Sequence, residues 1–330
     1  MRLHGRLDRL TLHSRVLADN PLGDPCEREL FVYVPAGYRQ DRRYASVTLL
    51  AGYGSTNHSL IGYDAFSPNV IERYDRLVHT GQAPEALIVL PDAMNRWGGS
   101  QFLDSPASGR YQEYLAEEVV EFVDRHYRTI PERTGRAIVG RSSGGFGALR
   151  MGLDRPDRFA VIGSHAGDCA FDISILPELR AAAIAYDLQG GFSAFAQAFT
   201  DDPNARNFTA IMILAYAAAY APEPDTPLPM CRVPIDSRTG SLDEVAWRQW
   251  LAHDPVVRTQ DDESAFADAN LVFLDAGDRD EHGLQFGARR LAALLSARGA
   301  NVVHEEFEGG HRGTGHRYEV SLPRLIAACG

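Results

Sequence analysis

Serine, histidine and aspartate together can perform nucleophilic catalysis, and this chain has each of them next to a predicted strand. The serine comes first along the chain. The run Gly140-Arg141-Ser142-Ser143-Gly144 fits the pattern G-x-S-x-G and lies between an apolar run at 136–140 and a helical pattern. At such a strand–turn–helix junction the middle serine is exposed on a strained turn, and the next N–H faces an oxyanion. We therefore predict Ser142 as a nucleophile and the N–H of Ser143 as an oxyanion donor. The alternative is a serine- and glycine-rich N-cap that only starts a helix.

A serine hydroxyl needs a base to accept its proton, and the base is expected after the last strand of such a fold. His304, His311 and His316 lie in or after the last strand pattern. His304 falls inside that pattern, which is typical of packing. His311 directly follows two glycines at the exit of the strand, where a loop can carry an imidazole to the edge of the sheet. We predict His311 as the base, with His316 as the alternative.

The acid that orients the base is expected after another late strand, here in LVFLDAGDRDEHG. Asp275 still belongs to the apolar run, whereas Asp278 and Asp280 both lie in the loop after Gly277, and the residues alone do not separate these two. The loop could also suggest a metal site, but it lacks a second group of ligands at a clear spacing, so solvated charge is the simpler interpretation. That interpretation concerns Asp278, Asp280, Glu281 and His282.

A second oxyanion donor is expected from the loop after an early strand. The run TLLAGYGSTNHS (48–59) reads as a strand followed by a glycine-rich loop, and we predict the N–H of Tyr53 as the donor. The alternative is an ordinary glycine turn. Trp97, Gln101 and Asp168 are candidates to line a substrate pocket, although packing or loop solvation explains them equally well.

The elements that must position these residues alternate along the chain. Apolar, β-rich runs predict strands, several of them covered on both faces, at 29–34, 46–51, 86–91, 136–140, 159–164, 271–276 and 301–307. Helical patterns lie between them, among them 111–127 and 286–299, the latter ending at a C-cap glycine, Gly299. This alternation predicts a mostly parallel sheet with helices on both faces.

The alternation stops at about residue 170. Up to about residue 262 the patterns are helical and interrupted by PEPDTPLP. A bare loop of that length is improbable inside a compact domain. We predict a helical insertion at 170–262, lying over the C-terminal edge of the sheet as a lid, within one domain that spans residues 1–330.

Charge and composition narrow the classes of partner. The 330 residues carry a net charge of −11 without a long single-sign block, which argues against a nucleic-acid partner and against binding to anionic lipid. No run reaches the ~18 apolar residues of a membrane span, and the N-terminus does not read as a secretory signal. The four cysteines are far apart, which favours free thiols in a reducing compartment. We expect a cytoplasmic protein, and leave homo-oligomerisation open.

Several stretches together resemble the putative-esterase family of α/β-hydrolases, which includes S-formylglutathione hydrolases, feruloyl esterase domains, enterochelin-type esterases and mycolyltransferases. They are VYVPAGY (32–38), LLAGYG (49–54), EVVEFVDRHYRT (118–129), GRSSGGFGAL (140–149) with RPDRFAVIGSHAG (155–167), and the late GDRDE and GGH. The resemblance covers about residues 28–168 and 252–325. It implies the α/β-hydrolase fold, Ser142 as nucleophile, His311 as base and Tyr53 as oxyanion donor. It also implies that the acid is Asp280, three residues after the glycine of G-x-x-D.

The resemblance implies a serine esterase that cleaves a small-molecule ester without a metal or organic cofactor. The chain departs from the family in three places: Ala51 stands where histidine is common, no aromatic residue follows His311 closely, and Arg141 beside the nucleophile is not universal. These departures weaken any transfer of substrate preference. An acyltransferase that uses the same acyl-enzyme is the alternative, and a non-catalytic binding protein of this fold is the third hypothesis.

Overall fold

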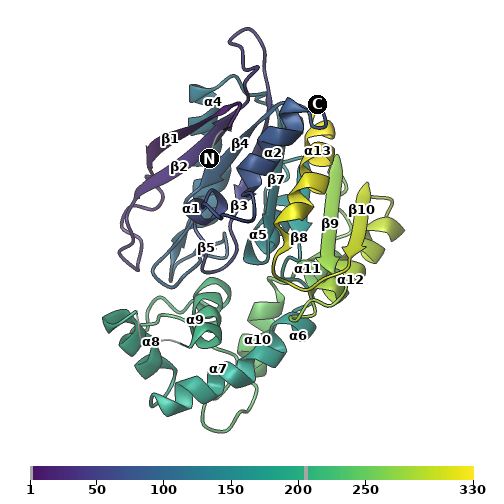
Figure 1. Ribbon diagram of the computed structural model, residues 1–330. Helices are drawn as coiled ribbons and strands as arrows, with labels where there is room; N and C mark the ends of the chain where they lie inside the picture. Colours follow the sequence, from purple (N-terminus) through teal and green to yellow (C-terminus); the bar gives the residue numbers. More distant parts are fainter. Residues whose placement is uncertain (1–2, 204–206) are drawn as a thin grey trace.

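The computed structural model describes residues 3–203 and 207–330, and its centre is an eight-stranded sheet in the order β1-β2-β4-β3-β7-β8-β9-β10 (Figure 1). The strands from β4 across to β10 run parallel, and β1 and β2 pair antiparallel at one edge. The predicted mostly parallel sheet is therefore confirmed. The strands are β1 (Arg6–His13), β2 (Glu27–Val34), β3 (Ala45–Leu50), β4 (Ala86–Pro91), β7 (Arg136–Arg141), β8 (Val161–His165), β9 (Leu271–Gly277) and β10 (Val302–Phe307).

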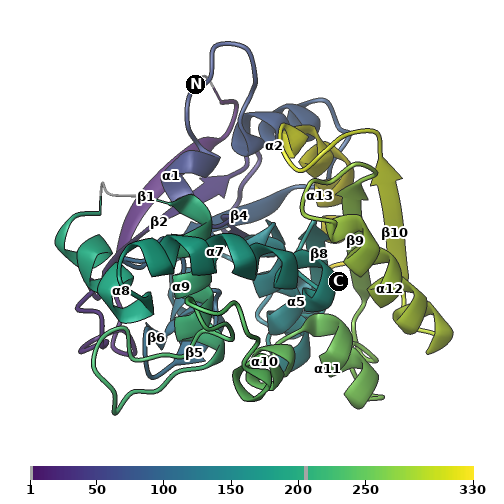
Figure 2. The ribbon, with the colours of Figure 1, turned by 90° about the horizontal axis from the view of Figure 1, so that it is seen from below.

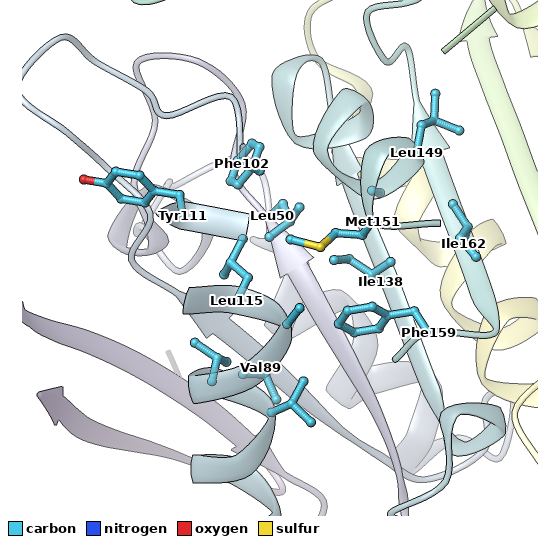
Figure 3. Close-up of a cluster of buried hydrophobic side chains, with 14 of the residues drawn as sticks. Leu50, Val89, Phe102, Tyr111, Leu115, Ile138, Leu149, Met151, Phe159 and Ile162 are labelled. Carbon is cyan, nitrogen blue, oxygen red and sulfur yellow. The ribbon is translucent and has the colours of Figure 1, made fainter. Parts of the chain in front are cut away.

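Helices cover both faces of this sheet, which explains why its central strands are apolar throughout. On one face α2 (Val70–His79) and α13 (Tyr318–Ala327) pack together over the inner strands. On the other face lie α4 (Val120–His126), α5 (Ser143–Asp154), α11 (Pro255–Asp261) and α12 (Leu284–Ala297). Strand β7 shows the alternation: Ile138 joins the core under α5, whereas Ala137 and Val139 join the core under α2 and α13. Figure 3 shows Ile138 among the side chains of the core under α5.

The predicted elements agree with the structure with a few differences. Every predicted strand is present to within two residues at either end. The edge strand β1 was not predicted, because Arg6, Asp8 and Arg9 interrupt its apolar residues. The predicted helix 111–127 is α3 (Tyr111–Glu113) and α4 joined by a π-helical stretch, Tyr114–Val119. Gly299 follows α12 with φ of +75°, as a C-terminal glycine does. A short hairpin, β5 (Asp104–Ser105) with β6 (Gly109–Arg110), completes the strands of the described chain.

Between β8 and β9 the chain forms a group of helices that lies together below the sheet in Figure 1 and faces the viewer in Figure 2. These helices pack around a second core, which includes Tyr186 and Trp250 and which they share with Trp97 and with Phe146 of α5. Helix α9 (Phe208–Tyr220) is apolar all round, and it is buried on nearly all sides. The helices are α6 (Phe171–Ser174), α7 (Leu176–Leu188), α8 (Phe192–Asp201), α9 (Phe208–Tyr220) and α10 (Glu244–Leu251). Across the described residues, no helix combines the length and the hydropathy that a membrane crossing demands.

Candidate active site

Ser142 occupies the turn between β7 and α5 in a conformation that few residues adopt. Its φ is 58° and its ψ is −128°, outside the regions that ordinary residues populate. Such a residue costs about 1–3 kcal/mol and persists only where its surroundings hold it in place. The Ser142 N–H donates to the carbonyl oxygen of His165 at 2.9 Å, which ties the turn to the end of β8. Its side chain remains partly exposed.

The glycines of the G-x-S-x-G pattern are needed because backbone packs directly on backbone here. A Cβ added to Gly140 would lie 2.4 Å from the carbonyl carbon and oxygen of Gly144, and a Cβ on Gly144 would lie 2.5 Å from the carbonyl oxygen of Leu50. A Cβ on Gly52 would lie 3.5 Å from the Cβ of Ser142. The loop after β3 therefore lies against the serine turn.

His311 and Asp280 form a hydrogen-bonded pair. His311 Nδ1 and Asp280 Oδ2 are 2.8 Å apart, and the N–H of His282 donates to Asp280 Oδ1 at 2.9 Å. Burial opposes the charge on Asp280, but the hydrogen bond and charge of His311 outweigh it and lower the pKa of Asp280 below its usual value. Because an ionised Asp280 accepts the proton on Nδ1, the Nε2 atom of His311 is left free to accept a proton.

The structure separates Asp280 from the other acidic candidates. Asp278 accepts from the N–H of Gly309 at 3.0 Å, where it fastens the loop after β10. Asp275 is buried inside β9 and pairs with His165 and Arg317. Glu281 accepts from the backbone N–H of His311 at 2.7 Å, so it supports the same loop. Of these four carboxylates, Asp280 bonds to the imidazole of His311, whereas Glu281 bonds to its backbone N–H.

The other histidines near the end of the chain are placed elsewhere. His304 lies within β10, as its position in the strand pattern predicted. His316 lies in a short 3₁₀ turn, where its ring contacts Phe307. His282 forms an ion pair with Glu178 of α7, which raises the pKa of His282, and its ring stands 5.0 Å from that of His311.

Arg141 links the strand that carries the serine to the loop that carries the histidine. Its Nη1 atom donates to the carbonyl oxygen of His311 at 3.2 Å and to Thr314 Oγ1 at 3.3 Å. Among the described residues, the Ser142 hydroxyl makes no hydrogen bond to His311 in this structure. Such contacts are often long in free enzymes and tighten when substrate is bound.

The two predicted oxyanion donors lie at one small cavity. Tyr53 and Ser143 both line it, and its volume is about 20 Å³. Neither backbone N–H donates to a carbonyl among the loop and turn hydrogen bonds of the described residues. The Tyr53 hydroxyl donates to the carbonyl oxygen of Trp97 at 2.7 Å, and its ring contacts that of Phe208. The Tyr53 side chain is thus anchored away from the turn, which leaves its N–H at the cavity.

Helix α9 contributes two tyrosines that sequence reasoning missed. The Tyr216 hydroxyl donates to Asp168 Oδ2 at 3.0 Å and lies 3.2 Å from Ser143 Oγ. The Tyr220 hydroxyl accepts from Gln101 Nε2 at 2.8 Å. Residues four apart share a helix face, so this spacing inside an alanine-rich run was a usable signal.

Two of the three pocket candidates lie near the serine turn and the third does not. Asp168 is buried, which raises the pKa of its carboxyl group, and the charges of His311 and His282 oppose that rise. Gln101 is fully buried and lines the small cavity, and its Oε1 atom has no partner among the described residues. Trp97 packs in the core of the helical group, and it lines neither the small cavity nor the turn.

Comparisons with known proteins identify the family. The model of the family described as "Putative esterase" matches residues 24–326. The curated protein Esterase Rv1288 of Mycobacterium tuberculosis (strain ATCC 25618 / H37Rv) is 27% identical over 141 residues, which are 41% of this chain and 28% of that protein. Endo-1,4-beta-xylanase Y of Acetivibrio thermocellus is 29% identical over 141 residues, which are 42% of this chain and 12% of that protein. The match therefore spans less than a third of either relative.

The fold resembles that of solved structures over nearly the whole length of the chain. A ferulic acid esterase superimposes with a TM-score of 0.63 at 21% identity, covering 99% of both chains. An S-formylglutathione hydrolase from Agrobacterium tumefaciens gives a TM-score of 0.60 at 16% identity, covering 100% of this chain and 98% of the other. At these identities the likeness shows the fold, which is the α/β-hydrolase fold. Because the family model matches nearly all of its residues, this chain belongs to the "Putative esterase" family.

Proposed function

We propose that this protein is a serine esterase that cleaves a small-molecule carboxylic ester through an acyl-enzyme. Ser142 is the nucleophile, His311 the general base and acid, and Asp280 the residue that orients His311. One observation carries the proposal: a strained, partly exposed serine stands on the turn between β7 and α5, and Arg141 beside it bonds to the loop of a His311–Asp280 pair.

In the first half-reaction His311 Nε2 accepts the proton of the Ser142 hydroxyl while Oγ forms a bond to the ester carbonyl carbon. The carbonyl π electrons move to oxygen and form a tetrahedral oxyanion. The C–O bond to the alcohol then breaks, and His311 delivers its proton to the departing alkoxide. Water repeats the sequence: its proton passes to His311, its oxygen bonds to the acyl carbon, the bond to Ser142 breaks, and Ser142 regains a proton.

The N–H groups of Tyr53 and Ser143 stabilise the oxyanion in this proposal. Both residues line the small cavity beside the serine turn, and the N-terminus of α5 points its positive end at the same place. One such donor contributes about 3–4 kcal/mol to transition-state stabilisation. A volume of about 20 Å³ leaves room for little more than a water-sized group, so a short acyl chain fits best.

The segment 170–262 acts as a lid within a single domain of residues 1–330. The contact that supports this role is made by Tyr216 of α9, which bonds to Asp168 and lies beside Ser143. Gln101 and Asp168 face the substrate from the sheet side of this contact.

Covalent labelling tests the proposal directly. A fluorophosphonate probe should label the wild-type protein and fail to label Ser142→Ala. Ser321→Ala is the matched control, because Ser321 is a buried serine that is hydrogen-bonded to another histidine, and this variant should still be labelled. Absence of labelling in folded wild-type protein would contradict the proposal. Release of acid into water, measured with and without an added alcohol acceptor, separates hydrolysis from acyl transfer.

A further inference from the structure

A second cavity lies on the other side of the serine turn. Its volume is about 440 Å³, and Gly52 lines both this cavity and the small one. Residues 313–315 form part of its wall, two to four positions after His311, whereas the small cavity contains no part of that loop. The leaving alcohol must take its proton from His311, so the alcohol belongs on the side of the larger cavity.

Arg141 lines this cavity with a guanidinium group that has no acidic partner. It is half-buried, and it makes no ion pair with any carboxylate in the part of the chain that the structure describes. Its hydrogen bonds to His311 and Thr314 come from Nη1 alone. Arginine presents five N–H donors in a planar fork, so most of them remain for a ligand.

Tyr318 adds a second unused donor at the same cavity. It is only 6% exposed, and its ring packs edge-on against His165 at 4.7 Å. Across residues 3–203 and 207–330 its hydroxyl has no hydrogen-bond partner, and its oxygen is not sealed from solvent, so a ligand in the cavity can reach it. Burial raises the pKa of Tyr318, and the charge of Arg141 only opposes that rise, so the group stays a protonated donor.

The acidic group at this cavity does not occupy these donors. Asp64 lines the cavity from the exposed loop before α2, and its Oδ1 atom accepts from the N–H groups of Phe66 and Ser67. Arg141 is thus the charged group on the side of His311, and Asp64 is fastened to its own loop.

We propose that Arg141, Thr314 and Tyr318 form a subsite for an anionic oxygen group on the leaving alcohol of the substrate. A carboxylate or a phosphate has the acceptors that a guanidinium fork and a hydroxyl bind. The inference rests on the proposed esterase function and names its substrate class: a short acyl ester of an alcohol that carries an anionic group. Arg141 has a second role as a positioning residue, because it holds the loop of His311.

Matched esters test the substrate class. The first comparison is 3- and 4-acetoxybenzoate against their methyl esters, with 4-acetoxyphenyl phosphate as the phosphate arm, each corrected for its rate of hydrolysis by hydroxide. We expect kcat/KM to favour at least one anionic ester by about tenfold over its neutral partner. Equal values across all pairs would overturn the proposal. A preference shown instead for mono(4-nitrophenyl) succinate over 4-nitrophenyl butyrate would overturn the assignment to the alcohol side.

Variants connect the preference to these residues. Tyr318→Phe removes only the unpaired hydroxyl, and it should lower the ratio of anionic to neutral kcat/KM by about tenfold, chiefly through KM. Arg141→Gln should lower that ratio further and also lower kcat for both esters, because it loosens the loop of His311, whereas Arg141→Lys should restore part of the ratio. Arg133→Gln is the control of equal charge change, since Arg133 precedes β7 at the opposite end of that strand. A ratio unchanged in both site variants would refute the subsite.

A binding measurement keeps this inference separate from the esterase proposal. Calorimetry with Ser142→Ala and 4-acetoxybenzoate should show binding that Tyr318→Phe weakens in the same background, while the methyl ester binds more weakly. Binding without hydrolysis by wild-type protein would refute the esterase function and keep the anion subsite. Hydrolysis without any preference for the anion would do the reverse.

Discussion

The described part of this chain contains two clusters of serine, histidine and aspartate, and they differ in whether their surroundings suit an active site. In the first, Asp280 and His311 are 2.8 Å apart and Ser142 stands on the neighbouring turn. In the second, Ser321 Oγ lies 2.8 Å from His165 Nε2, and His165 Nδ1 lies 2.6 Å from Asp275 Oδ1. By hydrogen bonds alone the second cluster is the more complete.

The second cluster lacks access and an anion site. Ser321, His165 and Asp275 are 0%, 3% and 1% exposed. Ser321 lies within α13, so its own backbone is part of a regular helix, and Arg317 neutralises Asp275 at 2.8 Å. This cluster ties α13 to the sheet. The comparison teaches that a hydrogen-bonded serine–histidine–aspartate chain does not by itself indicate an active site. An exposed serine and free N–H donors beside it are also needed.

Removal of the two serines should give the largest contrast. Ser142→Ala removes the atom that forms the acyl-enzyme in the proposed mechanism, so kcat/KM for a p-nitrophenyl ester should fall by about a millionfold. Ser321→Ala should keep kcat/KM within about threefold and lower the unfolding temperature, because it leaves the buried Nε2 atom of His165 without its hydrogen-bond partner. Steady-state kinetics and thermal unfolding monitored by circular dichroism measure the two effects. The reverse pattern would exchange the roles of the clusters.

Replacing Asp280 should mainly lower activity, whereas replacing Asp275 should mainly lower stability. Asp280→Asn should lower kcat by about ten-thousandfold, because the histidine loses the acceptor that fixes its tautomer. Asp275→Asn should instead cost about 3–5 kcal/mol of unfolding free energy, because it breaks a buried pair with Arg317. Urea unfolding and kcat on the same preparations decide between the two. A folded Asp275→Asn variant as inactive as Asp280→Asn would contradict this division.

Tyr216 should have a smaller effect on the active cluster. Tyr216→Phe removes the hydroxyl that joins Asp168 to the neighbourhood of Ser143, and kcat/KM should fall by about tenfold. Tyr186→Phe is the control, because its hydroxyl also makes one buried bond within the same helical group, to the carbonyl oxygen of Ala210 at 2.7 Å. Both variants should lose about 1 kcal/mol of stability. Equal kcat/KM in the two variants would place Tyr216 outside the site.

The smallest expected effect is the pH dependence of stability. The pKa of Asp168 is raised in the folded protein by burial, with His311, His282 and Asp280 acting on it through their charges. The folded state therefore keeps a proton that the unfolded state has lost, and this group's contribution to stability falls as pH rises from its unfolded pKa through its folded pKa.

Asp168→Asn has no proton to lose, so its unfolding free energy should rise relative to that of the wild type as pH rises through this window. Asp280, whose pKa is lowered, should show the opposite sign: the wild type loses stability relative to Asp280→Asn as pH falls through the folded pKa of Asp280. Urea unfolding of the three proteins at a series of pH values measures both differences. Parallel curves for the wild type and Asp168→Asn would show that Asp168 does not keep its proton.

The sequence predicted those candidate site residues that directly follow recognisable strands. The predicted residues Ser142, Asp280 and His311 all follow strands whose apolar runs are visible. The structure brings their loops together at the C-terminal ends of these parallel strands. Asp278 and Asp280 could not be separated by pattern, because the choice depends on which carboxylate the loop turns toward His311. The structure shows that Asp280 does so and that Asp278 bonds to its own loop.

Contacts across the fold were beyond reach from the sequence. The pairing of His165 with Asp275 joins residues 110 positions apart in neighbouring strands, and neither strand pattern reveals it. The contact of Tyr216 with Asp168 depends on where the helical group docks, which no local pattern of α9 encodes. The edge strand β1 was missed because its exposed face carries charge rather than apolar side chains.

The backbone contacts around Gly52, Gly140 and Gly144 have a consequence for how this protein could change. No side chain separates the serine turn from the loop after β3, so the proposed nucleophile and both proposed oxyanion donors belong to one unit whose spacing hardly tolerates variation. The helical group shares its core with Phe146 of α5, and two tyrosines of α9 bond to Gln101 or lie beside Ser143. Exchange of these helices between relatives is therefore a route to new ester preferences, provided that the contacts with Phe146 of α5 are kept.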